Sequence, residues 1–261
     1  MKTPLRDVLD FKSLQVLKQL IPQKSIVSTF LFYSGAIEFN LSHSDRFVVA
    51  HTNKGIIYEF WKCVEADSAY VAKQSKYFFD CLFRDESQIF PADSMFQHIQ
   101  ETWMKRSDPF ARASYFFLLN RCSKNGLISS GELNLKNANP LAFSALRNIK
   151  FKNFHTHFDK GKDFIDSIRP EEKSDYLLFP VGKYHNILFK SGNVAGCETT
   201  PVNHQELYEN LKQYDKKWVV LYKNHSDVFK LYEDYAITMV DKYGKRTTKK
   251  DKCEDIVIAN F

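Results

Sequence analysis

The stretch Ser25–Asn53, SIVSTFLFYSGAIEFNLSHSDRFVVAHTN, places the strongest constraint on how this chain can fold. An apolar run at 26–32 predicts a strand, Tyr33-Ser34-Gly35-Ala36 predicts a tight turn, and a short amphipathic helix follows. A second apolar run at 46–50 predicts another strand. This strand–turn–helix–strand order is how a Rossmann-like sheet opens a nucleotide pocket, although one glycine in the turn is a weak signal by itself.

The second half of the chain returns to the same rhythm. We expect strands at 153–158, 176–179, 218–222, 235–240 and 256–259, helices at 162–168, 203–213 and 227–232, and a loop from 180 to 201. Alternation of this kind indicates a mainly parallel α/β sheet, here closed by an antiparallel edge strand.

The middle of the chain has a different character. Helical patterns dominate 65–121, and 125–135 is typical of a β-hairpin with Ser130-Gly131 at its turn. We therefore predict an α/β core in two parts, 1–64 and 151–261, with an inserted helical and hairpin lobe at 65–150.

The amino-acid composition limits the classes of protein to which this chain can belong. With 44% apolar and 15% aromatic residues, 261 residues suffice for a sizeable core. Five scattered cysteines, odd in number and without a CxxC pair, argue against a disulfide framework and a zinc site. The sequence has no signal peptide and no apolar run long enough to span a membrane, so we expect a cytoplasmic protein without a membrane partner.

Two polar patterns allow both a functional and a structural interpretation. Six cations lie within eleven residues, and they could neutralise phosphates or form a solvated hairpin tip: Lys242, Lys245, Arg246, Lys249, Lys250 and Lys252. His155, His157 and Asp159 alternate as in a metal-binding strand, but a strand with a polar end explains them equally well. We expect no metal there.

Four stretches, in matching order and spacing, resemble the Dam-type adenine-specific DNA methyltransferases. The resemblance is carried by Phe32-Tyr33-Ser34-Gly35-Ala36, by Leu118–Leu127 (LLNRCSKNGL), by Trp218–Asp227 (WVVLYKNHSD) and by Asp255–Phe261 (DIVIANF). The second of these, similar to the family's L-N-R-x-x-x-N-G-L segment, is the most specific.

The resemblance implies two binding sites on a Rossmann-like methyltransferase sheet. In such a protein S-adenosylmethionine would be held by Lys12, Phe32, Ser34, Gly35, Ala36 and Thr52. DNA would be contacted by Arg121, Lys124, Asn125, Ser129 and Ser130 in and beside the hairpin, together with Lys245, Arg246 and Lys249.

The departures from the family indicate lost catalysis. The family's D/N-P-P-Y motif, whose acid or amide and aromatic ring hold the flipped adenine, is replaced by Pro180-Val181-Gly182-Lys183. Thr52 stands where the family has an acid for the ribose, and Ser34 stands in place of the second glycine of the turn. We expect no bound cofactor, or S-adenosylmethionine if the pocket is retained.

Three functions fit this pattern. The first is a catalytically inactive methyltransferase homologue that binds duplex DNA, or pairs with an active methyltransferase subunit, as a recognition or regulatory protein; restriction–modification would suit that role. The second is an active adenine methyltransferase with a divergent catalytic loop. The third is a protein-interaction module without a nucleic-acid role.

Overall fold

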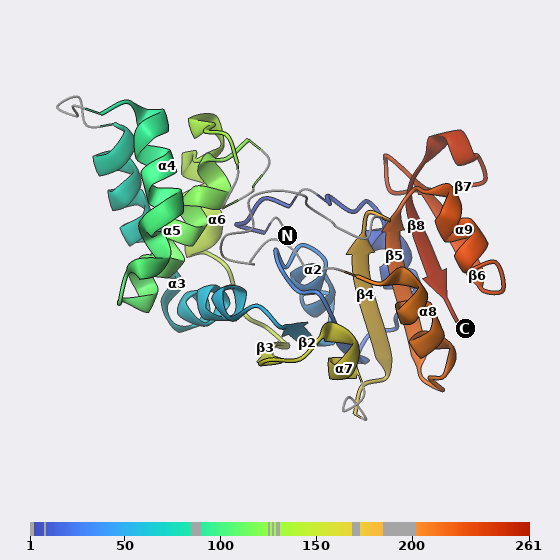
Figure 1. Ribbon diagram of the computed structural model, residues 1–261. Helices are drawn as coiled ribbons and strands as arrows, with labels where there is room; N and C mark the ends of the chain where they lie inside the picture. Colours follow the sequence, from blue (N-terminus) through green and yellow to red (C-terminus); the bar gives the residue numbers. More distant parts are fainter. Residues whose placement is uncertain are drawn as a thin grey trace. The chain divides into compact units, whose positions relative to one another are not determined.

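The computed structural model describes residues 3–7, 9–84, 90–124, 126, 128, 131–168, 173–184 and 202–261 (Figure 1). These residues form two compact units. The sheet unit holds the described residues of 9–53, 152–184 and 202–261. The helical unit holds residues 3–7 and the described part of 54–151.

An eight-stranded mixed sheet organises the sheet unit. Its strands are β1 (Ile26–Thr29), β2 (Phe47–Thr52), β3 (Phe154–Phe158), β4 (Tyr176–Gly182), β5 (Lys217–Lys223), β6 (Ala236–Asp241), β7 (Arg246–Thr247) and β8 (Cys253–Ala259). They lie in the order β3-β2-β1-β4-β5-β8-β6-β7. The first five are parallel, whereas β8 runs antiparallel to both β5 and β6.

This topology confirms the predicted Rossmann-like methyltransferase sheet. The order β3-β2-β1-β4-β5 is that of a doubly wound fold, with the strand order reversing beside β1. The antiparallel part is larger than the single edge strand that we predicted, because β8 is inserted between β5 and β6 and β7 closes the edge.

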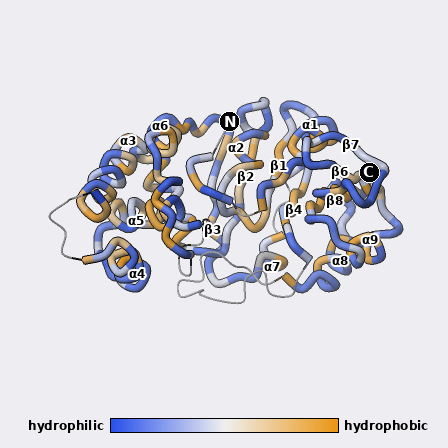
Figure 2. Tube along the Cα trace, turned by 90° about the horizontal axis from the view of Figure 1, so that it is seen from above, coloured by the Kyte–Doolittle hydropathy of each residue, from blue (hydrophilic) through white to orange (hydrophobic). Residues whose placement is uncertain are grey.

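Helices cover both faces of the sheet (Figure 2). On one side lie α1 (Leu14–Leu20) and α2 (Glu38–Ser42), and on the other α7 (Phe164–Ile168), α8 (His204–Lys212) and α9 (Ser226–Leu231). The second face buries a large aromatic core that includes Trp218, Tyr222 and Tyr232. All seven residues of β4 are buried, as expected of a central strand covered on both faces.

A buried carboxylate fixes the start of α1 to the sheet. Asp255 on β8 is fully buried, and it accepts hydrogen bonds from the backbone N–H groups of Lys12 and Ser13. The Nζ atom of Lys223 lies 2.6 Å from the same carboxylate. A buried charge is tolerated when it is paired and hydrogen-bonded, so this arrangement joins the start of α1 to β5 and β8.

The helical unit consists of α3 (Gly55–Phe83, broken at Asp67), α4 (Ala92–Thr102), η1 (Trp103–Lys105), α5 (Pro109–Cys122), η2 (Leu135–Asn137) and α6 (Pro140–Arg147). Asp108 caps α5 through its carboxylate, which accepts the N–H groups of Phe110 and Ala111, and Pro109 occupies the first turn. α5 is buried on nearly all sides, which its aromatic composition predicts.

Several predicted element bounds require correction. The strand predicted at 26–32 ends at Thr29, and the strand predicted at 256–259 begins at Cys253. The hairpin predicted at 125–135 has no strand among its described residues: Ser123 and Leu133 form an isolated bridge, and Leu135–Asn137 is a 3₁₀ turn that the Asn134 side chain caps. Asn125, Ser129 and Ser130 lie outside the described residues. The predicted end of β4 at 179 is also wrong, since the strand continues to Gly182.

Among the described residues, no helix is both long and apolar enough to cross a membrane.

The turn after β1 depends on one glycine. Gly35 has φ +74°, and a Cβ atom there would lie 2.5 Å from the Phe39 ring. Gly161 has φ +69°, but a Cβ atom there would meet no atom within 4 Å.

We predict that Gly35→Ala lowers the free energy of unfolding by about 2–4 kcal/mol, and Gly161→Ala by about 1–2 kcal/mol, since the latter adds backbone strain alone. Urea denaturation of both variants measures the difference; equal losses would contradict the close packing of Phe39.

Candidate functional site

The carboxyl ends of the parallel strands meet at one edge of the sheet, where α/β proteins bind ligands. The chain leaving β1 is clamped at this edge, because the Phe30 N–H donates to the carbonyl of Leu178 and the Phe32 N–H donates to that of His51, both at 2.9 Å. Leu31 between them has φ +62°, a conformation that costs a non-glycine residue of this size strain energy.

Most of the residues predicted to bind the cofactor lie in this turn. Phe32, Ser34 and Gly35 are buried, and the Ser34 hydroxyl accepts the Ala36 N–H at 3.3 Å. Thr52 is buried at the end of the neighbouring strand β2. The structure therefore brings the turn and the end of β2 to the same edge of the sheet.

Lys12 has different contacts from these. Its backbone N–H is held by Asp255 on β8, and its Nζ atom pairs with Asp10. Its ammonium group is therefore engaged beside the start of α1.

The residues at the end of β2 do not fit S-adenosylmethionine in the manner of the family. Residues 50–53 are Ala-His-Thr-Asn, so no carboxylate is present there to accept the ribose hydroxyls. His51, the neighbour of Thr52, has its ring stacked on Phe30 and its Nδ1 atom 3.1 Å from Asp159.

The four residues that align with the family's D/N-P-P-Y motif in the resemblance belong largely to β4. Pro180 pairs with Leu221, and the register shifts between Pro180 and Gly182, which makes Val181 the extra residue of a β-bulge. Gly182 has φ +88°, and a Cβ atom there would overlap a methyl carbon of Leu9. Lys183, which follows, is exposed. None of these four residues presents a hydrogen-bond acceptor on its side chain.

Three rings beyond β4 form a cluster that the sequence did not indicate. Tyr184 stacks on His204 (centroids 4.4 Å apart) and on His225 (4.9 Å). The Tyr222 hydroxyl lies 3.0 Å from Nδ1 of His204, and burial raises the pKa of the Tyr222 phenol, so it stays protonated. The only sequence signal for this cluster was the position of Tyr184, three residues after Val181.

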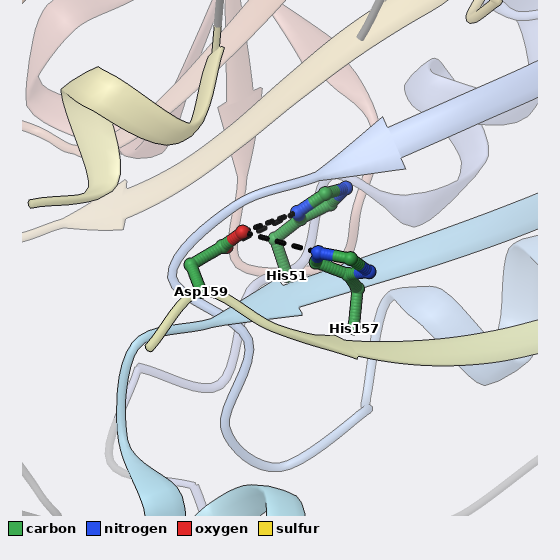
Figure 3. Close-up of side chains that lie close together, drawn as sticks. All are labelled: His51, His157 and Asp159. Carbon is green, nitrogen blue, oxygen red and sulfur yellow. Dashed lines mark hydrogen bonds and ion pairs between the residues drawn. The ribbon is translucent and has the colours of Figure 1, made fainter. Parts of the chain in front are cut away.

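Two histidines and an aspartate converge at the ends of β2 and β3 (Figure 3). His51 and His157 are register partners on these parallel strands, and Asp159 follows β3 directly. From the sequence we grouped His155 with His157 and Asp159, but His155 is exposed and the third member is His51. Only the pairing of β2 with β3 could identify it.

The two described DNA-contact candidates of the helical unit are held by other parts of the chain. The Arg121 guanidinium donates to the carbonyls of Pro4 (2.5 Å) and Thr3 (3.4 Å), and burial lowers its pKa to about 10. Lys124 is exposed and pairs with Glu132 at 3.3 Å. Arg121 therefore fixes the N-terminal segment in this conformation.

Asn120, the neighbour of Arg121, has the same role. Its fully buried side chain accepts the Arg6 N–H at 2.7 Å and donates to the carbonyls of Arg6 and Gly126. The Arg6 guanidinium in turn donates to the carbonyls of Ser123 and Lys124. Asn120 and Arg121 thus hold residues 3–6 to the rest of the helical unit.

The basic tract of the sheet unit is fully on the surface. It spans the turn from β6 to β7 and the 3₁₀ turn η3 (Lys250–Lys252), and all six of its cations are exposed. Arg246 donates to the side chain of Gln19, and Lys250 lies over the Phe229 ring at 5.0 Å. Lys250 also lines an open groove together with Asn224 and His225.

No protein-family model matches the chain, and no curated protein matches it. Among solved structures, the chain is similar to a TehB-like SAM-dependent methyltransferase from Corynebacterium glutamicum, with a TM-score of 0.40 and 8% identity over 96% of this chain and 86% of that one. At so low a TM-score, the class of fold rests on the strand order and strand directions of the chain itself.

We predict that Asn120→Ala destabilises the helical unit by about 2–4 kcal/mol, because it removes three hydrogen bonds that a buried side chain makes to the backbone of Arg6 and Gly126. Hydrogen exchange at residues 3–7 should accelerate in the same variant. The control is Asn148→Ala, at an exposed position, which should change stability by less than about 0.5 kcal/mol. Unchanged exchange in Asn120→Ala would contradict the anchoring role.

Proposed function

We propose that this chain is a catalytically degenerate relative of the Dam-type adenine DNA methyltransferases that binds duplex DNA as a recognition or regulatory protein. The observation that carries the proposal is the end of β4. There Pro180, Val181 and Gly182 are buried within the strand, at the position where the family places a base-binding loop.

The roles of the lost motif are not taken over by neighbouring residues of β4. Adenine methylation needs an acceptor for the amino group and a ring for the flipped base. A shift of the alignment by one residue brings Tyr184 to the aromatic position, but it then places Val181 at the acceptor position. The Tyr184 ring is moreover already stacked on His204 and His225.

The basic tract supports a DNA-binding role. Its six exposed cations lie between Lys242 and Lys252, and Lys250 extends the positive charge to the groove beside His225. Cations clustered in this way neutralise phosphates and release counterions on binding. Arg121 does not contribute to the proposed DNA surface, because its guanidinium is engaged with Thr3 and Pro4.

A protein without its own catalytic acceptor can still act on DNA by binding the duplex on behalf of a second, catalytic subunit. We propose an active methyltransferase as the partner in that case, with the restriction–modification setting that the resemblance implies. S-adenosylmethionine binding is not part of the proposed role, since the ribose-binding acid is absent from 50–53.

The test is binding to a short labelled duplex, followed by fluorescence anisotropy over a series of salt concentrations. The triple variant Lys245→Ala, Arg246→Ala, Lys249→Ala should bind more weakly and reduce the slope of log K against log salt by about 2.7, at about 0.9 per phosphate contact.

The matched control removes the same charge elsewhere in the sheet unit, through Lys160→Ala, Lys162→Ala and Lys173→Ala, all at exposed positions. This variant should keep most of the wild-type slope. An equal loss of affinity and slope in both variants would show that net charge alone, and not the basic tract, accounts for binding. Absence of binding by the wild-type protein at low salt would refute the DNA-binding role.

A further inference from the structure

We propose that His51, His157 and Asp159 form a binding site for one divalent transition-metal ion. The site follows from the topology of the sheet. β2 and β3 are parallel neighbours, His51 pairs with His157 in register, and the chain bends after β3 so that Asp159 faces both rings (Figure 3). The Asp159 N–H donates to the Thr52 carbonyl at 3.0 Å, which fixes the bend.

The distances suit a coordination shell. Nδ1 of His51 lies 3.1 Å and 3.4 Å from the two carboxylate oxygens of Asp159, and Nε2 of His157 lies 3.4 Å from one of them. A metal ion bonded at about 2.0–2.2 Å holds its ligand atoms roughly 3–3.5 Å apart. All three potential ligand atoms lie within 4.8 Å of one another, so a small turn of the His157 ring completes the site.

Two of the ligands are held in place before any ion binds. His51 is 2% exposed and Asp159 is 7% exposed. The His51 ring stacks on Phe30 with centroids 4.8 Å apart, and Phe30 stacks in turn on Phe179 at 5.0 Å. Supporting contacts of this kind orient metal ligands and raise affinity.

The third ligand provides access. His157 is 49% exposed, so its side of the cluster faces solvent. An ion held here would keep coordination positions for water or an external ligand, as in sites with two histidines and one carboxylate. Aromatic rings close the buried side, so an ion reaches the site past His157.

The donor set selects the kind of ion. Two imidazoles and one carboxylate suit Zn²⁺, Co²⁺ or Ni²⁺, whereas Mg²⁺ and Ca²⁺ prefer shells made of oxygen. Without a metal ion, the same three side chains form a triad in which one carboxylate contacts both histidines. The two arrangements differ in one respect: the triad predicts no stoichiometric uptake of metal.

The experiment uses the full chain without an oligohistidine tag, stripped with chelator and then titrated with Zn²⁺ by calorimetry and with Co²⁺ by visible absorption. We expect one ion per chain and Co²⁺ d–d bands. Asp159→Asn and His157→Ala should weaken binding by at least about tenfold. His155→Ala is the matched control, since it removes an exposed histidine from the same strand and should bind like the wild type.

Circular dichroism checks that each variant is folded, and His157→Ala should pass because this ring is half exposed. Absence of wild-type binding at millimolar metal would overturn the proposal. It would also be overturned if His157→Ala and His155→Ala bound metal equally well, because scattered surface histidines would then account for the uptake. The outcome is independent of DNA binding, which the basic tract carries.

Discussion

The placement of β4 between β1 and β5 is the constraint on which the rest of the site depends. All seven residues of β4 are buried, and the parallel ladders on both sides fix where each neighbouring strand ends. The β-bulge at Val181 and the packing of Gly182 on Leu9 then keep the chain in the sheet through residues 180–182. A catalytic loop would have to leave the sheet before this point.

The two ends of the carboxyl edge are occupied by the protein's own groups. Beyond β4, Tyr184 is stacked on two histidines. At the ends of β2 and β3, His51 is paired with Asp159. In the proposed function these contacts lie near the places where a methyltransferase would bind its base and its cofactor, so the proposed loss of catalysis concerns both ligands.

Much of the fold could be predicted from the sequence because it depends on local patterns. The apolar runs of β1, β2 and β5 and the Asp108-Pro109 start of α5 are signals of this kind. The insertion of β8 between β5 and β6 is not, since strand order depends on long-range pairing.

The candidate site was harder to predict for the same reason. His51 joins His157 only because β2 pairs with β3, which no spacing in the sequence reveals. The end of β4 was predicted too early because proline usually ends a central strand. Here the ladder to β1 ends with the bond from Phe30 to Leu178, before Pro180, so a proline is tolerated.

The central proposal is that this Rossmann-like sheet binds neither S-adenosylmethionine nor a flipped adenine. Calorimetric titration with S-adenosylmethionine tests it most directly, on protein first checked for co-purified ligand. We expect no detectable heat of binding at millimolar ligand. Micromolar binding at one molecule per chain would contradict the claim, and would show that His51, Thr52 and the Ser34-Gly35 turn still form a working pocket.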